Sequence, residues 1–537
     1  MRILVAEQLA PEGVEILRAA HDVDERVGLS KDEYLAILAE YDALVVRSQV
    51  QVDAEMISRG ARLAVIGRAG VGVDNVDLDA ATRAGITVVN APTGNTIAAA
   101  EHTLGLLYAL ARNIAAADAS FRRGEWKRSQ FTGVELRGKT LGLVGFGKIG
   151  QAVAVRAKAM EMTVLVADPF VTADLAALHG AEVVELADLL ERSDVVSLHV
   201  PKNRTTAGMI GARELGRMKP TAFVLNVARG GVVDEAALAD ALAAGTIAGA
   251  AVDVYTQEPP PADNPLRGAP HTVLTPHLGA STAEAQVRVA VEASQQVLDV
   301  LAGRPARYAV NAPLLGPETT TALAPFLPLA EALGSFVRQY LRGAVESLSV
   351  EAAGEIAAHE TSPLTAAALR GLLEGSTAER VNLVNAGHLA KTRGIAVTEQ
   401  RTDDAGSYSS LLTLHAEAGG RTVIVAGTIE AQKARLVRID DFWLHMEPAA
   451  SMLLTSHRDR PGIVGRIGAL LGAADVNISA MTLARLAPRA EALMLLALDA
   501  IPPDGIAAAI REDDAIIDVW VLRLAVDGDG ASGGRGA

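Results

Sequence analysis

The stretch TLGLVGFGKIG, residues 140–150, decides the fold of the central part of this chain. Its first half is an apolar run typical of a buried strand, and its second half has the spacing G-x-G-x-x-G at the start of a helical pattern. Gly145 permits a tight turn, Gly147 lets the backbone approach a pyrophosphate, and Gly150 lets the helix pack closely against the strand. This context predicts a Rossmann-type dinucleotide-binding domain and disfavours an ordinary βα turn.

A carboxylate at the end of the next predicted strand indicates which dinucleotide binds. Asp168 stands in VADP, 18 residues after Gly150, where it can accept hydrogen bonds from the ribose hydroxyls of the adenosine half. The same charge would repel a 2′-phosphate. The sequence therefore predicts NAD as the cofactor in preference to NADP.

The α/β pattern extends on both sides of this stretch. From residue 2 to about 92, short β-branched runs such as RILVAE and ALVVRS alternate with helical periods, and a second alternation runs from 139 to about 277. One continuous amphipathic helix is predicted over about 95–122 and connects the two alternations. These patterns predict two parallel α/β units.

The C-terminal part has a different organisation. Two prolines and the lack of an amphipathic period mark a boundary at 304–313, and an α+β region follows from about 316 to 448. From about 452, the predicted order is strand, helix, strand, strand, helix, strand, which is that of small ferredoxin-like domains. The segment 526–537 is mostly Gly, Ser, Asp and Ala and is predicted to be a disordered tail.

Composition excludes several classes of protein. The 537 residues predict three or four domains of ~150 residues, and no run approaches the ~18 apolar residues of a membrane helix. A net charge of −15 and only 3% aromatic residues argue against nucleic acid as a partner. Cysteine is absent and the N-terminal stretch meets an acid early, so we expect a cytoplasmic protein with neither disulfides nor a thiolate metal site.

Arg229, Glu258 and His277 follow three later strands of the second α/β unit, at the edge where such sheets bind ligands. His277 can take the proton of a hydroxyl group, Glu258 can orient the imidazole, and Arg229 can grip a carboxylate with two hydrogen bonds. Singly, each residue has an ordinary role as a strand cap, a solvated loop acid or a loop histidine. Their combination beside a dinucleotide fingerprint favours a site for hydride transfer from a 2-hydroxy acid.

Several motifs carry a family resemblance. In order, GFGKIG, VADP, SDVVSLHVP, NVARGGVVDEAAL, AAVDVYTQEPP and TPHLGAST resemble the D-2-hydroxyacid dehydrogenase family. RAGVGVDNVDLDAATRAGITVVNAP and the span to about Asn311 resemble the branch of that family that oxidises 3-phosphoglycerate. The resemblance implies the reversible NAD-dependent oxidation of 3-phosphoglycerate to 3-phosphohydroxypyruvate, the entry step of serine biosynthesis, with Arg229, Glu258 and His277 in the roles given above.

The resemblance also implies a domain plan and a set of cofactor contacts. A flavodoxin-like substrate domain, 1–97 with 284–308, would receive the Rossmann domain, 98–283, as an insertion. An intervening domain, 311–448, and an ACT regulatory domain, 450–525, would follow. Besides the three fingerprint glycines, the implied cofactor contacts are Lys148, Ile149, Asp168, Val227, Ala228, Asp253, Gly279 and Ala280.

Two arginines at βα turns of the N-terminal unit can face the crevice between the α/β units. Arg47 and Arg68 match arginines near the substrate phosphate in the resembled enzymes. That family typically has a threonine or a similar residue where Val71 stands. The cluster Trp126-Lys127-Arg128 either reaches the site of a partner subunit or is a solvated face.

The last α+β pattern resembles the ACT domain, an amino-acid-binding module. By that match, His457 and Asp459 end the first strand, Asp459 pairs with an amino group, and Asn477 binds a polar side chain across a two-fold interface. L-Serine is the implied effector. Alternatively, Asp459 caps a helix whose first turn contains Pro461.

The region before it resembles the extra domain of the long form of these enzymes, most clearly in RVNLVNA, 380–386, which the family often continues with a proline where Gly387 stands. A second anion site on this domain is a hypothesis. Its candidates are Lys433, Arg435 and Arg438, which otherwise are surface charges.

The preferred interpretation is a regulated NAD-linked dehydrogenase of 3-phosphoglycerate that forms a homotetramer. One alternative is a glyoxylate or hydroxypyruvate reductase of the same family. The other is a non-enzymatic protein that binds NAD as a conformational signal, as corepressors resembling this family do. Arg47, Arg68 and the two additional domains favour the first interpretation.

Overall fold

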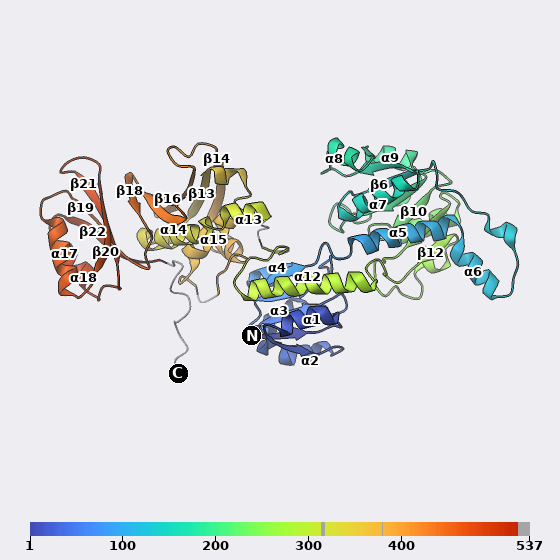
Figure 1. Ribbon diagram of the computed structural model, residues 1–537, viewed down its shortest axis with the longest axis horizontal. Coiled ribbons are helices and arrows are strands. Elements are labelled where there is room, and N and C mark those ends of the chain that lie inside the picture. The colour runs from blue at the N-terminus through green and yellow to red at the C-terminus, as the bar shows by residue number, and fades with distance from the viewer. Residues whose placement is uncertain (313–316, 378–379, 525–537) are drawn as a thin grey trace.

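A computed structural model gives the fold and describes residues 1–312, 317–377 and 380–524 (Figure 1). Within these residues, the strands form one five-stranded, one seven-stranded, one six-stranded and one four-stranded sheet, in chain order. The first two sheets are parallel α/β, and the last two are mixed or antiparallel, which confirms the predicted fold class. The predicted tail, 526–537, lies outside the described residues.

The first sheet has the order β2-β1-β3-β4-β5 with every pairing parallel, which is the flavodoxin-like order. Its strands are β1 Arg2–Val5, β2 Asp22–Glu25, β3 Ala43–Val46, β4 Val65–Arg68 and β5 Thr87–Asn90. Its helices are α1 Pro11–Arg18, α2 Lys31–Ile37, α3 Ala54–Arg59 and α4 Leu78–Arg83. The sequence patterns did not reveal β2, a partly exposed edge strand whose residues are DVDE.

The second sheet has the Rossmann order extended by one strand, β12-β11-β10-β9-β6-β7-β8. Its strands are β6 Thr140–Val144, β7 Thr163–Ala167, β8 Ala181–Val183, β9 Val195–Leu198, β10 Phe223–Asn226, β11 Gly249–Val252 and β12 Thr272–Leu274. The helices between them are α7 Lys148–Ala159, α8 Ala173–Leu178, α9 Leu186–Arg192, α10 Ala212–Leu215 and α11 Glu235–Ala243. The strand order reverses between β6 and β9, so the fingerprint loop after β6 lies at the ligand-binding position of such sheets.

Two connections join the α/β units. The helix predicted over about 95–122 is wrong as a single helix, because Asn113 has a left-handed backbone (φ 53°) that separates α5, Thr96–Ala111, from α6, Ile114–Arg122. The second connection is α12, Ala283–Leu301, whose apolar side chains join the core of the first sheet beside Ile3 and Val45. The chain thus leaves the first unit, builds the second and returns.

The third sheet has the order β14-β13-β15-β16-β17-β18, with a parallel pair at one edge and antiparallel pairing elsewhere. Its strands are β13 Ser347–Gly354, β14 Ala396–Thr402, β15 Ser410–Ala418, β16 Arg421–Glu430, β17 Lys433–Ile439 and β18 Phe442–Met446. The helices of this region are α13 Pro317–Leu323, α14 Phe326–Leu341, α15 Ser362–Leu373 and α16 Ala386–Thr392.

The fourth sheet, β20-β21-β19-β22, is antiparallel and has the ferredoxin-like βαββαβ order. Its elements are β19 Ser451–Arg458, α17 Ile463–Ala473, β20 Ile478–Arg485, β21 Glu491–Leu498, α18 Ile506–Arg511 and β22 Ile516–Arg523. Successive residues of β19 point to opposite faces, so Leu453 packs under α17 and α18 while Met452 and Leu454 enter the core of the third sheet. The two C-terminal sheets therefore share one hydrophobic core.

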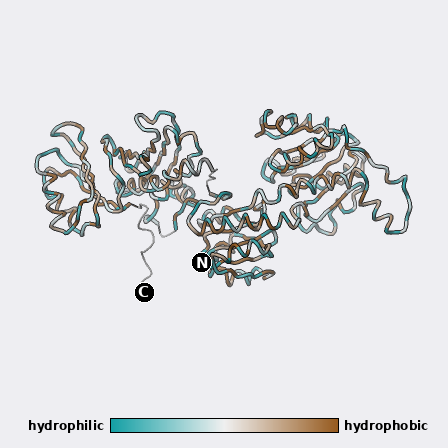
Figure 2. The backbone as a smooth tube through the Cα atoms, viewed as in Figure 1, coloured by the Kyte–Doolittle hydropathy of each residue, from teal (hydrophilic) through white to brown (hydrophobic). Residues whose placement is uncertain are grey.

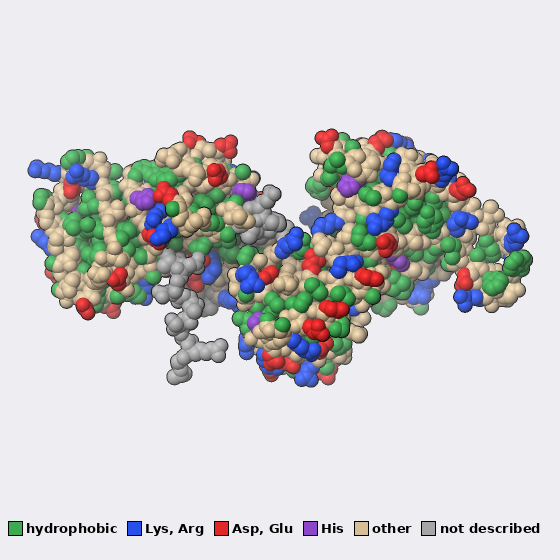
Figure 3. Space-filling model, viewed as in Figure 1, with side chains coloured by type: hydrophobic (Ala, Val, Ile, Leu, Met, Phe, Trp, Pro, Cys, Tyr) green, Lys and Arg blue, Asp and Glu red, His purple; other side chains and the backbone are tan. Residues whose placement is uncertain are grey.

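Apolar residues concentrate along the sheets and on the helix faces that cover them, whereas loops are mostly hydrophilic (Figure 2). Across residues 1–312, 317–377 and 380–524, no helix combines the length and the apolar character needed to cross a membrane. On the face shown in Figure 3, acidic and basic side chains are interspersed over the first unit, so this face carries no large patch of one sign.

Candidate active site

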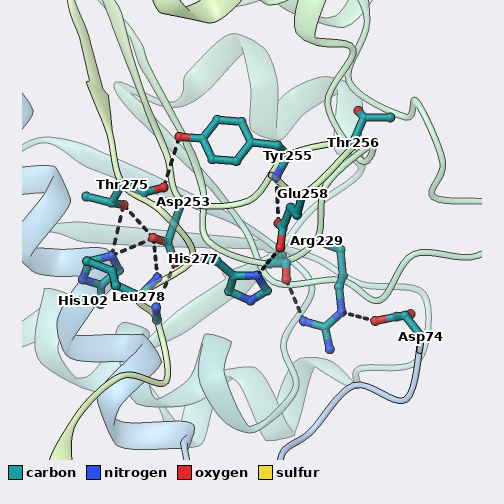
Figure 4. Close-up of polar contacts among 12 residues, drawn as sticks. Asp74, His102, Arg229, Asp253, Tyr255, Thr256, Glu258, Thr275, His277 and Leu278 are labelled. Carbon is teal, nitrogen blue, oxygen red and sulfur yellow. Dashed lines mark hydrogen bonds and ion pairs between the residues drawn. The ribbon is translucent and has the colours of Figure 1, made fainter. Parts of the chain in front are cut away.

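His277 and Glu258 form a hydrogen-bonded pair beyond the carboxyl ends of β11 and β12 (Figure 4). His277 Nδ1 lies 2.6 Å from Glu258 Oε2, and Glu258 Oε1 accepts a hydrogen bond from the Tyr255 amide at 3.0 Å. Burial raises the pKa of Glu258, but the hydrogen bonds from His277 and from the Tyr255 amide outweigh burial and lower the pKa below its usual value. An ionised Glu258 requires a proton on Nδ1, which leaves Nε2 free to act as a base.

Space for a ligand exists beside this pair. A cavity of about 500 Å³ is lined by both side chains and by Tyr255, Asn264 and Arg267, among others. The His277 side chain is 45% exposed, so the ring is held on one side and open on the other. Neither Arg229 nor Arg68 lines this cavity, so it is distinct from the crevice that holds the two arginines.

Asp253, at the end of β11, organises the loop that carries His277. Its fully buried carboxylate accepts hydrogen bonds from the Leu278 amide at 2.8 Å and the Gly279 amide at 2.9 Å, and its carbonyl accepts from the His277 amide at 2.8 Å. Thr275 Oγ1 also donates to the carboxylate, at 2.6 Å. Burial raises the pKa of Asp253, but the contact with His102 and the bonds from Thr275 and Leu278 outweigh it, so the net pKa is lowered.

Arg229 extends from the loop after β10 toward the first unit (Figure 4). Its Nε donates to Asp74 Oδ2 at 3.1 Å, and a side chain on Gly72 would collide with its guanidinium, since an added Cβ would lie 2.2 Å from a terminal nitrogen. The buried Asn226 amide donates to the Arg229 carbonyl at 3.1 Å and fixes the loop. Arg229 therefore spans the crevice between the two α/β units.

Arg68 is the last residue of β4, and Arg47 follows β3 directly. Both lie at the same crevice. Burial and the charge of Arg229 lower the pKa of Arg68 to about 10, still far above neutrality, so it remains cationic. Arg47 also acts electrostatically on Arg68, so the three guanidiniums share one environment. The Arg68 Nε is buried and has no hydrogen-bond partner among the described residues.

The loop that carries Arg47 is held by a buried acid. Glu7 accepts hydrogen bonds from the amides of Arg47 at 2.9 Å and Val50 at 3.0 Å. No sequence pattern pointed to Glu7, which follows the first strand and looks like an ordinary polar residue.

The fingerprint loop has the shape that a dinucleotide needs. Gly145 has φ 94° and its added Cβ would lie 2.6 Å from the His199 carbonyl, while the added Cβ of Gly150 would lie 2.5 Å from the Gly145 carbonyl. Gly147 faces open space at the start of α7, where a pyrophosphate can approach the helix N-terminus. Asp168 accepts from the Phe146 amide at 2.8 Å and so lies against this loop. The residues present therefore fit the cofactor.

The other predicted cofactor contacts lie around the same crevice. Val227 and Ala228 follow β10, and an added Cβ on Gly279 would lie 3.2 Å from a Val227 methyl group. Gly279 and the half-buried Ala280 belong to the loop after His277. Lys148 and Ile149 begin α7, and the Lys148 ammonium lies 5.3 Å from the Tyr308 ring centre.

Asp74 and His102 are further members of the site that sequence patterns did not reveal. Asp74 meets Arg229 although the two are 155 positions apart, and His102 Nε2 lies 3.2 Å from Asp253 Oδ1 across 151 positions. His102 comes from α5, which crosses beneath the His277 loop (Figure 4). Only the fold brings these pairs together.

The predicted effector residues lie in the fourth sheet, at the opposite end of the molecule from β10 and β12 (Figure 1). Asp459 Oδ2 accepts from Arg485 at 2.9 Å and from the Arg489 amide at 3.0 Å. Asn477 donates to Asp499 at 2.6 Å, and burial lowers the pKa of His457. The alternative role of Asp459 as a helix cap is wrong, because α17 begins after Gly462 without a side-chain cap.

The predicted anion-site candidates on β17 have partners within the protein. Lys433 and Arg435 both contact Glu447, at 3.4 and 2.8 Å, and Arg438 donates to the Asp440 carbonyl at 2.7 Å. Among the described residues, no group of His, Asp and Glu side chains could hold a metal ion.

Comparisons with known proteins match both halves of the chain. The model of the D-isomer specific 2-hydroxyacid dehydrogenase NAD binding domain matches residues 104–279, and that of the D-3-phosphoglycerate dehydrogenase intervening domain matches 322–440. The D-3-phosphoglycerate dehydrogenase of Synechocystis sp. is 45% identical over 525 residues, which cover 97% of this chain and 95% of the relative.

The similar solved structures cover little more than half of this chain. The TT0316 protein from Thermus thermophilus has 38% identity and a TM-score of 0.54, covering 58% of this chain and 100% of its own. The NAD-dependent formate dehydrogenase from Staphylococcus aureus, solved with NAD, has 28% identity and a TM-score of 0.52, covering 57% of this chain and 97% of its own.

Proposed function

The chain belongs to the D-3-phosphoglycerate dehydrogenases, NAD-dependent enzymes of the D-isomer specific 2-hydroxyacid dehydrogenase family, and we propose that it oxidises 3-phosphoglycerate to 3-phosphohydroxypyruvate as the first step of serine biosynthesis. One observation carries this proposal: the His277–Glu258 pair lies beyond the strand ends of the second unit together with Arg229, and Arg229 reaches Asp74 of the first unit, which also contributes Arg47 and Arg68. A base, a carboxylate grip and a second cation are what a phosphorylated 2-hydroxy acid requires.

In the proposed reaction, NAD, when bound, supplies the acceptor for the hydride. Arg229 binds the substrate carboxylate and thereby orients the carbinol carbon. His277 accepts the hydroxyl proton at Nε2, while Glu258 keeps Nδ1 protonated and stabilises the imidazolium that forms. Asp253 holds the loop, so the base stays in place between turnovers.

Selectivity for the phosphorylated substrate rests on Arg68 and Arg47. Arg68 lies deep in the crevice with a buried Nε that has no partner among the described residues, and a phosphate oxygen is a suitable acceptor. In the proposed domain plan, these arginines belong to the substrate domain, 1–97 with 284–308, and the base belongs to the cofactor domain, 98–283. Substrate would therefore contact both units at once.

The test is NADH formation at alkaline pH with 3-phosphoglycerate, glycerate or 2-hydroxyglutarate, each with wild type and with Arg68→Gln. We expect a strong preference for 3-phosphoglycerate that Arg68→Gln largely removes through a higher KM. Equal kcat/KM for glycerate would contradict the proposal and favour a glyoxylate or hydroxypyruvate reductase. NAD binding without turnover of any hydroxy acid would favour the NAD-sensing alternative.

We further propose that L-serine inhibits the enzyme at the fourth sheet, the ACT domain of the domain plan. Asp459 and Asn477 stand at the end of β19 and before β20, where their polar groups already meet Arg485 and Asp499. An amino acid carries both an ammonium and a carboxylate, so it can replace these intramolecular partners. The same NADH assay with and without serine tests this regulation.

We also propose self-association, as a homotetramer, through the α6 segment. This segment projects from the second unit and displays hydrophobic side chains (Figure 3). Trp126 is 77% exposed, and its ring centre lies 6.2 Å from that of the exposed Phe121. Exposed aromatic pairs of this kind mark interfaces. Light scattering of Phe121→Ser and Trp126→Ser variants tests it, since unchanged mass would exclude this surface.

A further inference from the structure

We propose that His102, on α5, is a positioning residue that holds the catalytic loop through Asp253 and so keeps the His277 base in place. The inference rests on the proposed dehydrogenase function and deepens it. The His102 ring meets the Asp253 carboxylate with Nε2 3.2 Å from Oδ1 (Figure 4). The two residues are 151 positions apart, so they meet only because α5 packs against β11 and β12.

The contact fixes which nitrogen of the His102 ring carries a proton. Burial of the Asp253 carboxylate raises its pKa, but the hydrogen bonds that it accepts, with that from His102 foremost, bring the pKa below its usual value. An ionised carboxylate can only accept hydrogen bonds, so Nε2 of His102 must be the donor. The ring therefore acts on Asp253 as a hydrogen-bond donor that comes from a separate helix.

The other donors to this carboxylate cannot replace His102 as an anchor. Thr275 Oγ1, at 2.6 Å, and the amides of Leu278 and Gly279, at 2.8 and 2.9 Å, belong to the same loop as His277. They tie the loop to the carboxylate but move with the loop. Among the described residues, His102 is the one donor to this carboxylate that lies outside the loop, so it can fix the direction in which the carboxylate points.

Another histidine of the second unit shows what distinguishes His102. His199 follows β9 directly, and its Nε2 lies 2.9 Å from the hydroxyl oxygen of Ser197, two positions away. Burial lowers the pKa of His199 to about 4, so this ring is neutral at pH 7. Its bond stays within one strand end. The His102 contact instead joins a helix to a loop and can hold the two in register.

The helix that carries His102 extends the consequence beyond the loop. α5 leads from the first unit into the second and lies tightly against β11, because an added Cβ on Gly249 would be 3.1 Å from a methyl group of Leu110. A shift of α5 would move the Asp253 carboxylate and, with it, the two amides next to His277. The base is thereby tied to the connection between the two α/β units as well as to Glu258 beside it.

The experiment compares His102→Leu and His102→Gln with wild type in the full chain. Leucine removes the donor, whereas the glutamine amide can still donate to the carboxylate. The matched control is Thr103→Val, which removes a buried hydrogen bond of 2.8 Å to the Ala99 carbonyl from the same helix without touching Asp253. The readouts are hydrogen exchange of segment 275–280 by mass spectrometry, without ligands, and NADH formation from 3-phosphoglycerate.

We expect the Leu278 and Gly279 amides to exchange about tenfold faster in His102→Leu, because a carboxylate that can rotate releases both amides. The kcat should fall about tenfold while KM for 3-phosphoglycerate changes less than about twofold, since the arginines of the crevice are untouched. His102→Gln should restore most of both properties. Thr103→Val should behave as wild type in both.

A double variant separates positioning from a general loss of stability. His102→Leu combined with Asp253→Asn should lower kcat no further than Asp253→Asn alone, because His102 acts through that carboxylate. Wild-type exchange or wild-type kcat in His102→Leu, equal changes in Thr103→Val, or a fully additive loss in the double variant would overturn the proposal. If the wild type oxidises no hydroxy acid, the proposed function fails, and the exchange measurement alone decides the role of His102.

Discussion

The proposed functional side chains at the two ends of the molecule differ in how their polar atoms are hydrogen-bonded. In the crevice between the α/β units, buried groups such as Asp253 and Asn226 hold the backbone, and the reactive ring of His277 is bonded through Nδ1 alone, although Arg229 pairs with Asp74. In the fourth sheet, the carboxylate of Asp459 and the amide of Asn477 already have partners within the protein.

The difference indicates how each site would respond to its ligand. The base is pre-organised, because the His277–Glu258 pair needs little rearrangement to meet a ligand, whereas Arg229 must release Asp74 or the Ala228 carbonyl to bind a carboxylate with two hydrogen bonds. A ligand of the fourth sheet must exchange existing hydrogen bonds for new ones, and only the difference in free energy is available for a conformational response. Four substitutions test this comparison, in order of their expected effect on turnover.

His277→Ala should have the largest effect. It removes the proposed base from a loop that Asp253 holds independently, so kcat should fall by about 10² or more while NAD affinity stays nearly unchanged. Steady-state NADH formation and an NAD titration measure both quantities. His21→Ala, in the first unit, is the control. Unchanged turnover in His277→Ala would remove this residue from the mechanism.

Asp253→Asn tests the pre-organisation itself. An amide would turn a donor toward the Leu278 or Gly279 amide, which is also a donor, and would leave a buried group unsatisfied. We expect the free energy of unfolding to fall by about 1–3 kcal/mol and kcat to fall roughly tenfold through a looser His277 loop. Urea denaturation measures the first effect and NADH kinetics the second. A variant as stable and active as the control Asp263→Asn would contradict this role.

Asp168→Ala should act on cofactor binding, both by removing the ribose acceptor and by releasing the Phe146 amide of the fingerprint loop. It removes the predicted ribose acceptor, so NAD should bind about tenfold more weakly and the preference for NAD over NADP should narrow, with kcat at saturating NAD retained. The ratio of kcat/KM for the two cofactors is the measurement. Asp174→Ala, an exposed acid on α8, provides the comparison. An unaltered ratio would place the discriminating charge elsewhere.

Asn477→Ala should leave turnover without serine unchanged and abolish inhibition by serine. The variant opens the Asn477–Asp499 pair at the proposed effector site without touching the crevice. Point substitution is preferable to truncation after residue 448, because β19 and β22 contribute to the core under the third sheet. Initial rates with increasing serine give the answer, with Asp504→Ala as the control. Full inhibition in Asn477→Ala would move the effector site away from this residue.

Strand ends and glycines were predictable, whereas long-range pairs were not. The apolar run before GFGKIG, and the sequence neighbours of Arg229, Glu258 and His277, place these residues at strand ends without reference to the rest of the chain. The Asp74–Arg229 contact depends on how the two units meet, which no local pattern encodes.

The prediction of secondary structure failed where the local sequence signal is weak, or where the backbone conformation of a single residue overrides the apolar periodicity. The edge strands β2 and β8 have the sequences DVDE and AEV, and each gains its place by backbone pairing to one neighbour. The apolar periodicity of 95–122 is genuine, but the left-handed backbone of Asn113 ends one helix and starts another. Periodicity predicts which faces are buried, not where a helix breaks.

The shared core of the two C-terminal sheets has an evolutionary consequence. Tyr340 of α14 and Trp520 of β22 lie with ring centres 4.8 Å apart, and Arg342 packs on Trp520 and pairs with Asp518. A small regulatory module joined only by a linker could be exchanged between proteins as a cassette. Here, recombination at residue 449 would separate interlocking surfaces, so the last two sheets should be inherited together and should melt as one cooperative unit.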